Sequence, residues 1–493
     1  MRLKILLGHL VFLLHGFLSA GTIISGYAPE LKDKTMRLYS YTDFISNNLV
    51  LIDESIVAED GMFYLEFSSK EILYVKLSCD NIAAHIYTQP GSEYEIEFPL
   101  PSLDIVRTFA KEAKTEVIFN NLDEKDINAD IIDFNYNYEI FFKRNREILG
   151  KLFSPKNYSS RNDSIARTNS KRLTAKQLFA QLDHFSSAMD SIYAGSDSEY
   201  FKLHRNAVIG DLRMNSSASP REIFDAHIAS FRFSLNHPEF TKLVQRFFKF
   251  YFVKNSSYFG EQSLDSALNV NGSLNDLMRI MEKDDFLENK EMKEIVACMA
   301  IKEIWNGRTK REKLAKILGE IVSNGESKGS RKVATEVLNS LTNNRKGFQL
   351  KNFEFEDQFN QRRSITDLQG KPCLIEISAD WCSACQQEEA ALASLIKEYQ
   401  KDFRFLKINV FLDKETQEIA NVEYVIHSSI SQHAPIIKSL GIAKLPSYIL
   451  LDKNGVVLLD KTPMPSNGLE AVLEKNRLKS KKGDRNTVGS KEN

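Results

Sequence analysis

The sequence predicts a multidomain protein: an N-terminal antiparallel β-sandwich, an all-α middle region and a C-terminal α/β domain. With 493 residues, the chain is about three times the length of a usual domain. Apolar residues alternate with period two up to about Phe98, which indicates strands. From about position 125 to 345 they recur every three or four residues, which indicates helices. An apolar strand pattern starting at Cys373 then leads into a helix that opens with two cysteines.

Charge and cysteine content exclude several classes of protein. Lys and Arg total 65 and Asp and Glu total 66, giving a net charge of −1. A nucleic-acid-binding protein would normally carry a basic excess, so nucleic acid is not expected as a partner of this chain. Five cysteines in so long a chain do not make a small disulfide-scaffolded module. No cofactor is predicted, and the composition indicates no oligomeric state.

Residues 1–20 are predicted to be a cleaved signal peptide. Arg2 and Lys4 precede an apolar stretch from Ile5 to Phe17, and the small residue Ala20 ends the segment. The mature chain would then be exported; in a bacterium, its destination would be the periplasm. The alternative is an uncleaved N-terminal membrane anchor, because roughly 25 residues up to Pro29 carry no charge and could span a bilayer.

Residues 21–120 are predicted to be the β-sandwich domain. Turn residues such as Asp60-Gly61 and Pro90-Gly91 separate runs of alternating polarity. The expected strands are Met36–Tyr41, Leu49–Ile56, Met62–Phe67, Ile72–Cys79, Asn81–Tyr87 and Glu93–Phe98.

Residues 121–345 are predicted to be helical and show no motif that carries chemistry. The Phe-rich stretch Phe247–Phe252 is expected to be a buried helix. The expected helices are Ile131–Leu152, Ala175–Tyr193, Arg221–Leu235, Phe240–Val253, Leu274–Met281, Lys290–Trp305 and Lys313–Val322.

Residues 346–475 are predicted to form the α/β domain, followed by a disordered polar tail at 476–493. The cysteine pair opens a helix that runs to about Tyr399, and a later helix is expected near Ser431–Leu440. The expected strands are Phe348–Phe355, Arg363–Leu368, Cys373–Ser378, Phe403–Val410 and Leu445–Asp452. This order of elements, with CxxC at a helix start, is similar to a thioredoxin fold.

The spacing of Cys382 and Cys385 suits disulfide exchange. At a helix N-terminus, unpaired N–H groups and the positive end of the helix dipole stabilise a thiolate, which is the nucleophile. Cys385 lies three residues on, on the same helix face, close enough to form a disulfide with Cys382. Cys382 is therefore the predicted attacking thiol, and Cys385 the thiol that resolves the mixed disulfide.

Other interpretations of the cysteines remain open. A CxxC pair can form half of a zinc site, with two further ligands elsewhere. His427 and His433 are poorly spaced to supply those ligands, so a zinc site is disfavoured and no metal is predicted. The pair could also be an inert disulfide, in a degenerate thioredoxin-like fold that serves as a non-catalytic envelope binding module. The remaining cysteines lie in apolar patterns and are expected to be buried thiols: Cys79, Cys298 and Cys373.

Four segments taken together carry a family resemblance: Ser364–Lys371, Trp381–Cys385, Glu388 and Leu445-Pro446. Over roughly residues 346–475 the chain resembles the thioredoxin superfamily, and within it the TlpA/ResA-like extracytoplasmic thiol-disulfide oxidoreductases. Its N-terminal β-domain resembles the kind often fused to such proteins.

The resemblance implies roles for further residues. Pro446 would be the cis-proline that faces the active-site disulfide, and the Leu445 backbone and Trp381 would contact substrate. Glu388 matches the glutamate that follows the motif in these proteins. Glu376 is placed like the buried acid of thioredoxin; within an apolar strand its pKa should be raised, so that it can exchange a proton with Cys385.

The resemblance also implies a direction of electron flow. Such proteins are mostly reductants of protein or peptide disulfides and are fed electrons by a membrane partner, so we expect a reductase. The sequence departs from the family at Ser383-Ala384 between the cysteines, at Ala390 where a proline is common, and at Ile377-Ser378 before the motif. These departures leave the redox potential open.

Overall fold

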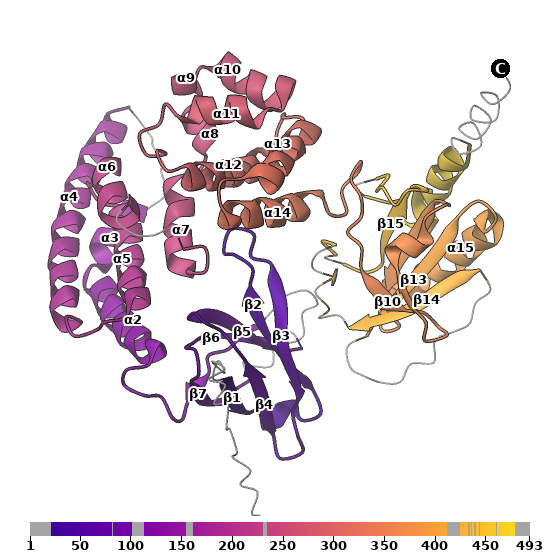
Figure 1. The fold of residues 1–493 in the computed structure, drawn as a ribbon, viewed down its shortest axis with the longest axis horizontal. Helices are drawn as coiled ribbons and strands as arrows, with labels where there is room; N and C mark the ends of the chain where they lie inside the picture. Colours follow the sequence, from indigo (N-terminus) through magenta and orange to yellow (C-terminus); the bar gives the residue numbers. More distant parts are fainter. Residues whose placement is uncertain are drawn as a thin grey trace, which may run out of the picture.

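The computed structural model describes residues 21–80, 82–100, 113–153, 161–229, 234–411, 424–431, 434, 436–437, 440–442, 444–459 and 461–478. The predicted signal peptide and all but the first residues of the predicted polar tail lie outside these ranges. Across the described residues, none of the helices combines the length and apolar character needed to cross a membrane. Figure 1 shows the β-rich region (indigo) beside the helices (magenta to orange), with the α/β domain (orange to yellow) at one side.

The N-terminal region consists of two sheets that pack as a sandwich. The first has the order β4-β1-β7-β9 and the second β3-β2-β5-β6-β8. Most neighbours are antiparallel, as predicted, but β1–β7 and β6–β8 are parallel. The parallel β1–β7 pair arises because the chain leaves the first sheet after β4, builds β5 and β6 in the second, and re-enters beside β1. The strands are β1 (Thr22–Tyr27), β2 (Thr35–Tyr41), β3 (Leu49–Ile56), β4 (Met62–Phe67), β5 (Leu73–Cys79), β6 (Ile82–Thr88), β7 (Glu93–Glu97), β8 (Ala113–Lys114) and β9 (Ile118–Phe119).

The two sheets share one hydrophobic core. In β4 every second residue is buried, so Phe63, Leu65 and Phe67 face inward while the residues between them face solvent. They pack with Ile24 of the same sheet and Leu38 of the other. Each fully buried side chain of this size contributes about 1.5–3 kcal/mol, and this burial fixes which face of each strand points inward.

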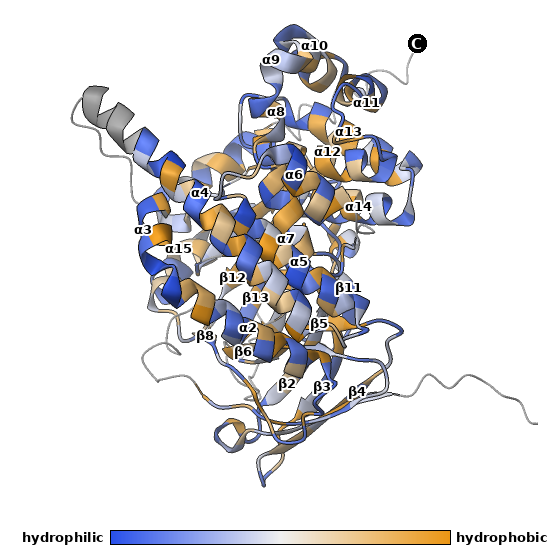
Figure 2. Cartoon of the chain, turned by 90° about the vertical axis from the view of Figure 1, so that its left-hand side faces the viewer, coloured by the Kyte–Doolittle hydropathy of each residue, from blue (hydrophilic) through white to orange (hydrophobic). Residues whose placement is uncertain are grey.

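The middle region is helical, as predicted, with two hydrophobic cores. One core joins α2 to α5, the other joins α6 to α14, and α5 contributes to both. Most of the larger helices carry both hydrophobic and hydrophilic residues (Figure 2), as amphipathic helices do. The helices are α2 (Ile127–Arg144), α3 (Arg146–Phe153), α4 (Arg161–Ile192), α5 (Glu199–Arg213), α6 (Pro220–Phe224), α7 (Pro238–Phe247), α8 (Tyr251–Lys254), α9 (Ser256–Phe259), α10 (Glu261–Asp265), α11 (Leu274–Met281), α12 (Lys290–Ile304), α13 (Arg311–Asn324) and α14 (Lys328–Thr342).

The prediction of one helix through the Phe-rich stretch was wrong. Helix α7 ends at Phe247, and Phe250 adopts a left-handed backbone with φ of 58° before α8 begins. The turn lets Phe248 and Phe252 enter the core from two directions, while Phe250 stays half exposed.

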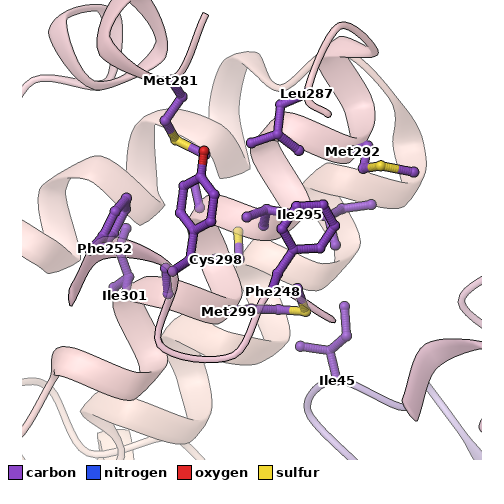
Figure 3. Close-up of a cluster of buried hydrophobic side chains, with 14 of the residues drawn as sticks. Ile45, Phe248, Phe252, Met281, Leu287, Met292, Ile295, Cys298, Met299 and Ile301 are labelled. Atoms are coloured by element: carbon purple, nitrogen blue, oxygen red, sulfur yellow. The ribbon is translucent and has the colours of Figure 1, made fainter. Parts of the chain in front are cut away.

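A loop of the sandwich inserts into the larger helical core. Ile45, between β2 and β3, points toward Phe248 and Met299 (Figure 3) and is almost fully buried. Lys302 donates from its Nζ to the Ile45 carbonyl at 2.7 Å. This contact fastens the sandwich to α12.

The C-terminal domain has a four-stranded sheet of order β14-β13-β12-β15. Strands β12, β13 and β14 are parallel and β15 is antiparallel to β12. The elements are β10 (Glu354–Glu356), β11 (Arg362–Ser364), β12 (Cys373–Ser378), α15 (Ser383–Tyr399), β13 (Arg404–Phe411), β14 (Val425–Ser431), β15 (Ser447–Leu451) and the π-helical turn η5 (Pro465–Leu469). The sequence prediction missed β14 and extended strand β11 into Ile365–Leu368, which is a 3-10 helix.

Candidate active site

The two cysteines of the motif are joined as a disulfide at the start of α15. Cys382 is the residue that caps this helix, and its Sγ accepts a hydrogen bond from the Cys385 backbone N–H at 3.1 Å. Both side chains are buried against the core on one face of β12. The backbone donor is placed to stabilise negative charge on the Cys382 sulfur once the disulfide opens.

Two of the predicted substrate residues lie close to this pair, Trp381 by its place in the chain and Leu445 by its packing. Trp381 is 43% exposed although it precedes a buried cysteine, so an indole surface lies beside the disulfide. The Leu445–Pro446 peptide bond is cis, and Leu445 packs against the hydrophobic cluster that includes Cys382 and Cys385. The structure thus brings Trp381, Leu445 and both cysteines to one part of the domain.

Glu376 lies on the opposite face of β12, underneath α15. It shares this face with Leu374, which packs in one cluster with Leu392 and Tyr399 of α15. Its side chain is 5% exposed, and Oε2 has no hydrogen-bond partner. Burial raises the pKa of Glu376 to about 7, although Lys407 opposes the shift.

Three further polar side chains lie in register with Glu376 across the sheet. Glu376 is opposite Tyr448 in β15 and Lys407 in β13, and Lys407 is opposite His427 in β14. The Lys407 Nζ lies 3.9 Å from Glu376 Oε2 and 3.0 Å from an oxygen of Glu389 on α15. Burial alone would lower the pKa of Lys407, but these two carboxylates outweigh it and raise it.

The outer members of this row are buried. The Tyr448 hydroxyl faces Glu376, and the Nε2 of His427 has no hydrogen-bond partner. Burial raises the pKa of Tyr448 far above its ordinary value, and burial lowers that of His427, so both are neutral at pH 7. His427, considered above as a zinc ligand, therefore belongs to this row, and His433 lies outside the described residues.

Glu388 has a different position from Glu376. It is half-buried, and its carboxylate accepts hydrogen bonds from the Ser466 backbone N–H at 2.8 Å and the Ser466 hydroxyl at 2.6 Å. The glutamate therefore ties α15 to η5. Neither of these bonds reaches a cysteine.

Lys407 and Tyr448 were not predicted from the sequence. A signal existed for Lys407: a lysine inside the apolar run Phe405–Val410 needs a charge partner, and Glu376 is the acid of the neighbouring apolar strand. The partner in β15 depends on strand register, which the sequence does not show.

The family model for thioredoxin matches residues 349–455. This part of the chain is a thioredoxin domain. The thiol-disulfide oxidoreductase ResA of Bacillus thuringiensis subsp. konkukian is 26% identical over 136 residues, covering 26% of this chain and 77% of the relative. The thioredoxin-like protein YneN of Bacillus subtilis is 24% identical over 115 residues, covering 22% and 68%.

Solved structures with similarity to the thioredoxin domain carry the same family name. A thiol-disulfide oxidoreductase from Bacteroides fragilis is 24% identical, with a TM-score of 0.20, covering 22% of this chain and 85% of that one. The thioredoxin domain of one from Bacteroides vulgatus is 18% identical, with a TM-score of 0.23, covering 26% and 96%. At the level of the family, the prediction of a thioredoxin-like thiol-disulfide oxidoreductase is confirmed.

Proposed function

We propose that this chain is an exported reductase of protein disulfides that works through Cys382 and Cys385. The observation that carries the proposal is the disulfide at the first turn of α15, with a backbone N–H directed at the Cys382 sulfur. The names of the relatives, thiol-disulfide oxidoreductases, agree with this chemistry.

The reaction is a two-electron exchange. In the reduced form, the Cys382 thiolate attacks a substrate disulfide, forms a mixed disulfide and releases one substrate thiolate. The Cys385 thiolate then attacks the Cys382 sulfur, closes the Cys382–Cys385 disulfide and releases the second substrate thiol. The substrate is reduced and the protein oxidised; a membrane electron donor would return the two electrons.

Glu376 is the proposed proton carrier for Cys385. A carboxyl group with a pKa of about 7 is half protonated at neutral pH and can both accept and donate a proton there. Its burial on the strand that leads into the cysteine motif supports this role, and the contact with Lys407 at 3.9 Å is the competing ion pair.

Trp381, Leu445 and Pro446 are the proposed substrate contacts. The exposed indole offers apolar surface beside the disulfide, and an extended substrate segment could pair with the Leu445 backbone. Glu388 would act near the site only by holding η5 against α15, because its hydrogen bonds go to Ser466.

The remaining parts of the proposal concern location and architecture. Residues 1–20 would direct export to the periplasm or anchor the chain in the membrane. Residues 21–120 and 121–345 would form the sandwich and helical domains, and 346–475 the catalytic domain, with 476–493 as a polar tail.

The decisive experiment replaces the attacking sulfur. Cys382→Ser is expected to reduce disulfide-reductase turnover to the uncatalysed level, and Cys385→Ser to accumulate a mixed disulfide visible by mass spectrometry. Cys373→Ser is the matched control, since Cys373 is a buried thiol elsewhere on β12. Unchanged turnover in Cys382→Ser would sink the proposal.

A redox titration then sets the direction of electron flow. A reversible couple near about −270 mV, or lower, supports a reductase, whereas one near about −120 mV indicates an oxidant. A pair that never cycles would leave the non-catalytic binding module as the function.

A further inference from the structure

Three metal-ligand side chains converge in the helical region, in elements that carry none of the proposed catalytic residues. His204 lies on α5, His237 is the residue that caps α7, and Glu239 lies in the first turn of α7. One ligand atom from each lies within 4.8 Å of the other two. The Oε2 of Glu239 is 3.3 Å from His204 Nδ1 and 3.8 Å from His237 Nδ1.

The hydrogen bonds of His237 fix which of its nitrogens faces the cluster. Its Nε2 lies 3.3 Å from the Tyr200 carbonyl oxygen, which can only accept, so Nε2 carries the proton. Its Nδ1 therefore has the lone pair, which the Phe240 backbone N–H shares at 3.2 Å. Burial lowers the pKa of His237 to about 4, so the ring is neutral at pH 7. An imidazole oriented in this way by a backbone carbonyl is the usual state of a metal-ligating histidine.

Glu239 brings a negative charge to the same place. Burial alone would raise its pKa, but the contact with His204 outweighs that effect and lowers it, so the group is a carboxylate at pH 7. The Tyr87 hydroxyl, on β6 of the sandwich, donates to both carboxylate oxygens at 3.3 and 3.4 Å. At metal sites, a carboxylate that ligates the metal commonly accepts a hydrogen bond from a residue that does not contact the metal.

His204 is the member that the protein leaves incompletely satisfied. Its side chain is 3% exposed; Nδ1 lies 3.3 Å from Glu239 Oε2, whereas Nε2 has no hydrogen-bond partner. A protonated ring would bury an N–H without an acceptor, and a neutral ring would leave the Glu239 carboxylate without a full positive charge beside it. A metal ion bound at Nδ1 in place of a proton would neutralise the Glu239 carboxylate, while Nε2 keeps its proton.

We infer that His204, His237 and Glu239 form a site for a divalent transition-metal ion of the zinc type. Two imidazoles and one carboxylate are a ligand set that zinc accepts, with a fourth position for water. Tetrahedral ligands about 2.0–2.1 Å from zinc lie about 3.3 Å apart, and the two ligand separations of 3.3 and 3.8 Å are close to this value. Binding through His237 Nδ1 replaces its bond to the Phe240 N–H.

The position of the site indicates a structural role. His204 and Glu239 come from helices that pack on each other, and Tyr87 reaches them from the second sheet of the sandwich. A metal ion here would join α5 to α7 next to the sandwich. The inference does not depend on the proposed redox function.

The test uses the oxidised full-length chain, in which Cys382 and Cys385 are blocked as a disulfide. After chelator treatment, Zn²⁺ binding is measured by calorimetry and Co²⁺ binding by its visible absorption, which reports the coordination geometry. Wild type is expected to bind one equivalent in a tetrahedral site and to gain thermal stability with the metal. Glu239→Gln and His204→Phe are expected to lose both effects, and Tyr87→Phe to bind about 10–100-fold more weakly.

Matched controls keep this test decisive. Glu239→Gln preserves shape, and His204→Phe preserves the edge contact of the ring with Phe134, so both variants should fold by circular dichroism. His184→Ala removes an exposed histidine of α4 and should bind as wild type does. Absence of binding by wild type, or retention of the single equivalent in both ligand variants, would overturn the inference and leave the cluster as a buried ion pair.

Discussion

Two glutamates in different parts of this molecule have pKa values shifted in opposite directions: Glu376, whose side chain is 5% exposed, and Glu239, whose side chain is 28% exposed. Glu376 lies in the central strand of the thioredoxin domain, and burial raises its pKa to about 7. Glu239 lies in the helical region, and its pKa is lowered although burial alone would raise it. The charge state of each carboxyl group is therefore set by the groups that face it as well as by its burial.

The two carboxylates differ in their polar neighbours. Glu239 accepts from the Tyr87 hydroxyl and faces His204 and His237. Glu376 has an oxygen without any hydrogen-bond partner, and its single cation, Lys407, is 3.9 Å away and also serves Glu389. The less buried carboxyl, beside two imidazoles and a hydroxyl, keeps its charge and suits a cation, whereas the more deeply buried one changes its proton near neutral pH and suits proton transfer.

The largest expected effect comes from removing the titrating carboxyl. Because the pKa of Glu376 is higher in the folded state, its contribution to stability is complete below about 4.5 and is lost as pH rises through about 7. The difference corresponds to about 3 kcal/mol of domain stability. Glu376→Gln cannot ionise, so the variant should become more stable than wild type as the pH increases from 5 to 8.

Hydrogen-exchange mass spectrometry of β12 peptides at both pH values, corrected for intrinsic exchange rates, measures this change. Glu389→Gln is the control, because its 64% exposed carboxyl contacts the same lysine but is not buried. If wild type and Glu376→Gln kept the same relative protection at pH 5 and pH 8, Glu376 would not titrate between them, and the contrast with Glu239 would disappear.

The same difference in surroundings explains what the sequence could predict. Glu376 could be found because an acid in an apolar strand is exceptional whatever its neighbours are. Cys382 could be found because the motif and the start of the helix that follows it are both visible in the local sequence. Lys407, Tyr448 and the His204 cluster could not be predicted, because they depend on strand register and on helix packing between distant segments.

The sequence prediction also missed helices α5 and α14, because their local patterns are weak. Helix α5 buries His204 and Arg205, so its inward face is not apolar enough for the periodicity to stand out. Helix α14 is rich in Ser, Thr and Asn and buries few apolar side chains, among them Val333 and Val337. The strands of the sandwich were easier to predict, since alternation in a half-buried strand such as β4 is a property of the local sequence.

A smaller effect should follow from removing the one cation near Glu376. Lys407→Met keeps the length of the side chain and deletes the charge that opposes the raised pKa of Glu376. The pKa of Glu376 should rise further, by about one unit, and the pH at which β12 loses protection should move upward by the same amount. A midpoint that stays in place would show that Lys407 serves Glu389 alone.

The smallest effect is expected at Glu388, which tests whether polar neighbours also decide the role of a carboxylate inside the thioredoxin domain. Glu388 is only half-buried and accepts two hydrogen bonds from Ser466, so it resembles Glu239 more than Glu376. Glu388→Ala should therefore cost about 1–2 kcal/mol of domain stability and leave the pH dependence of disulfide exchange unchanged. Glu398→Ala, at an exposed position of the same helix, controls for the substitution itself. A different result would be a shifted pH profile for Glu388→Ala without faster hydrogen exchange in η5. The carboxylate would then act on the cysteines, and its polar neighbours would not predict its function.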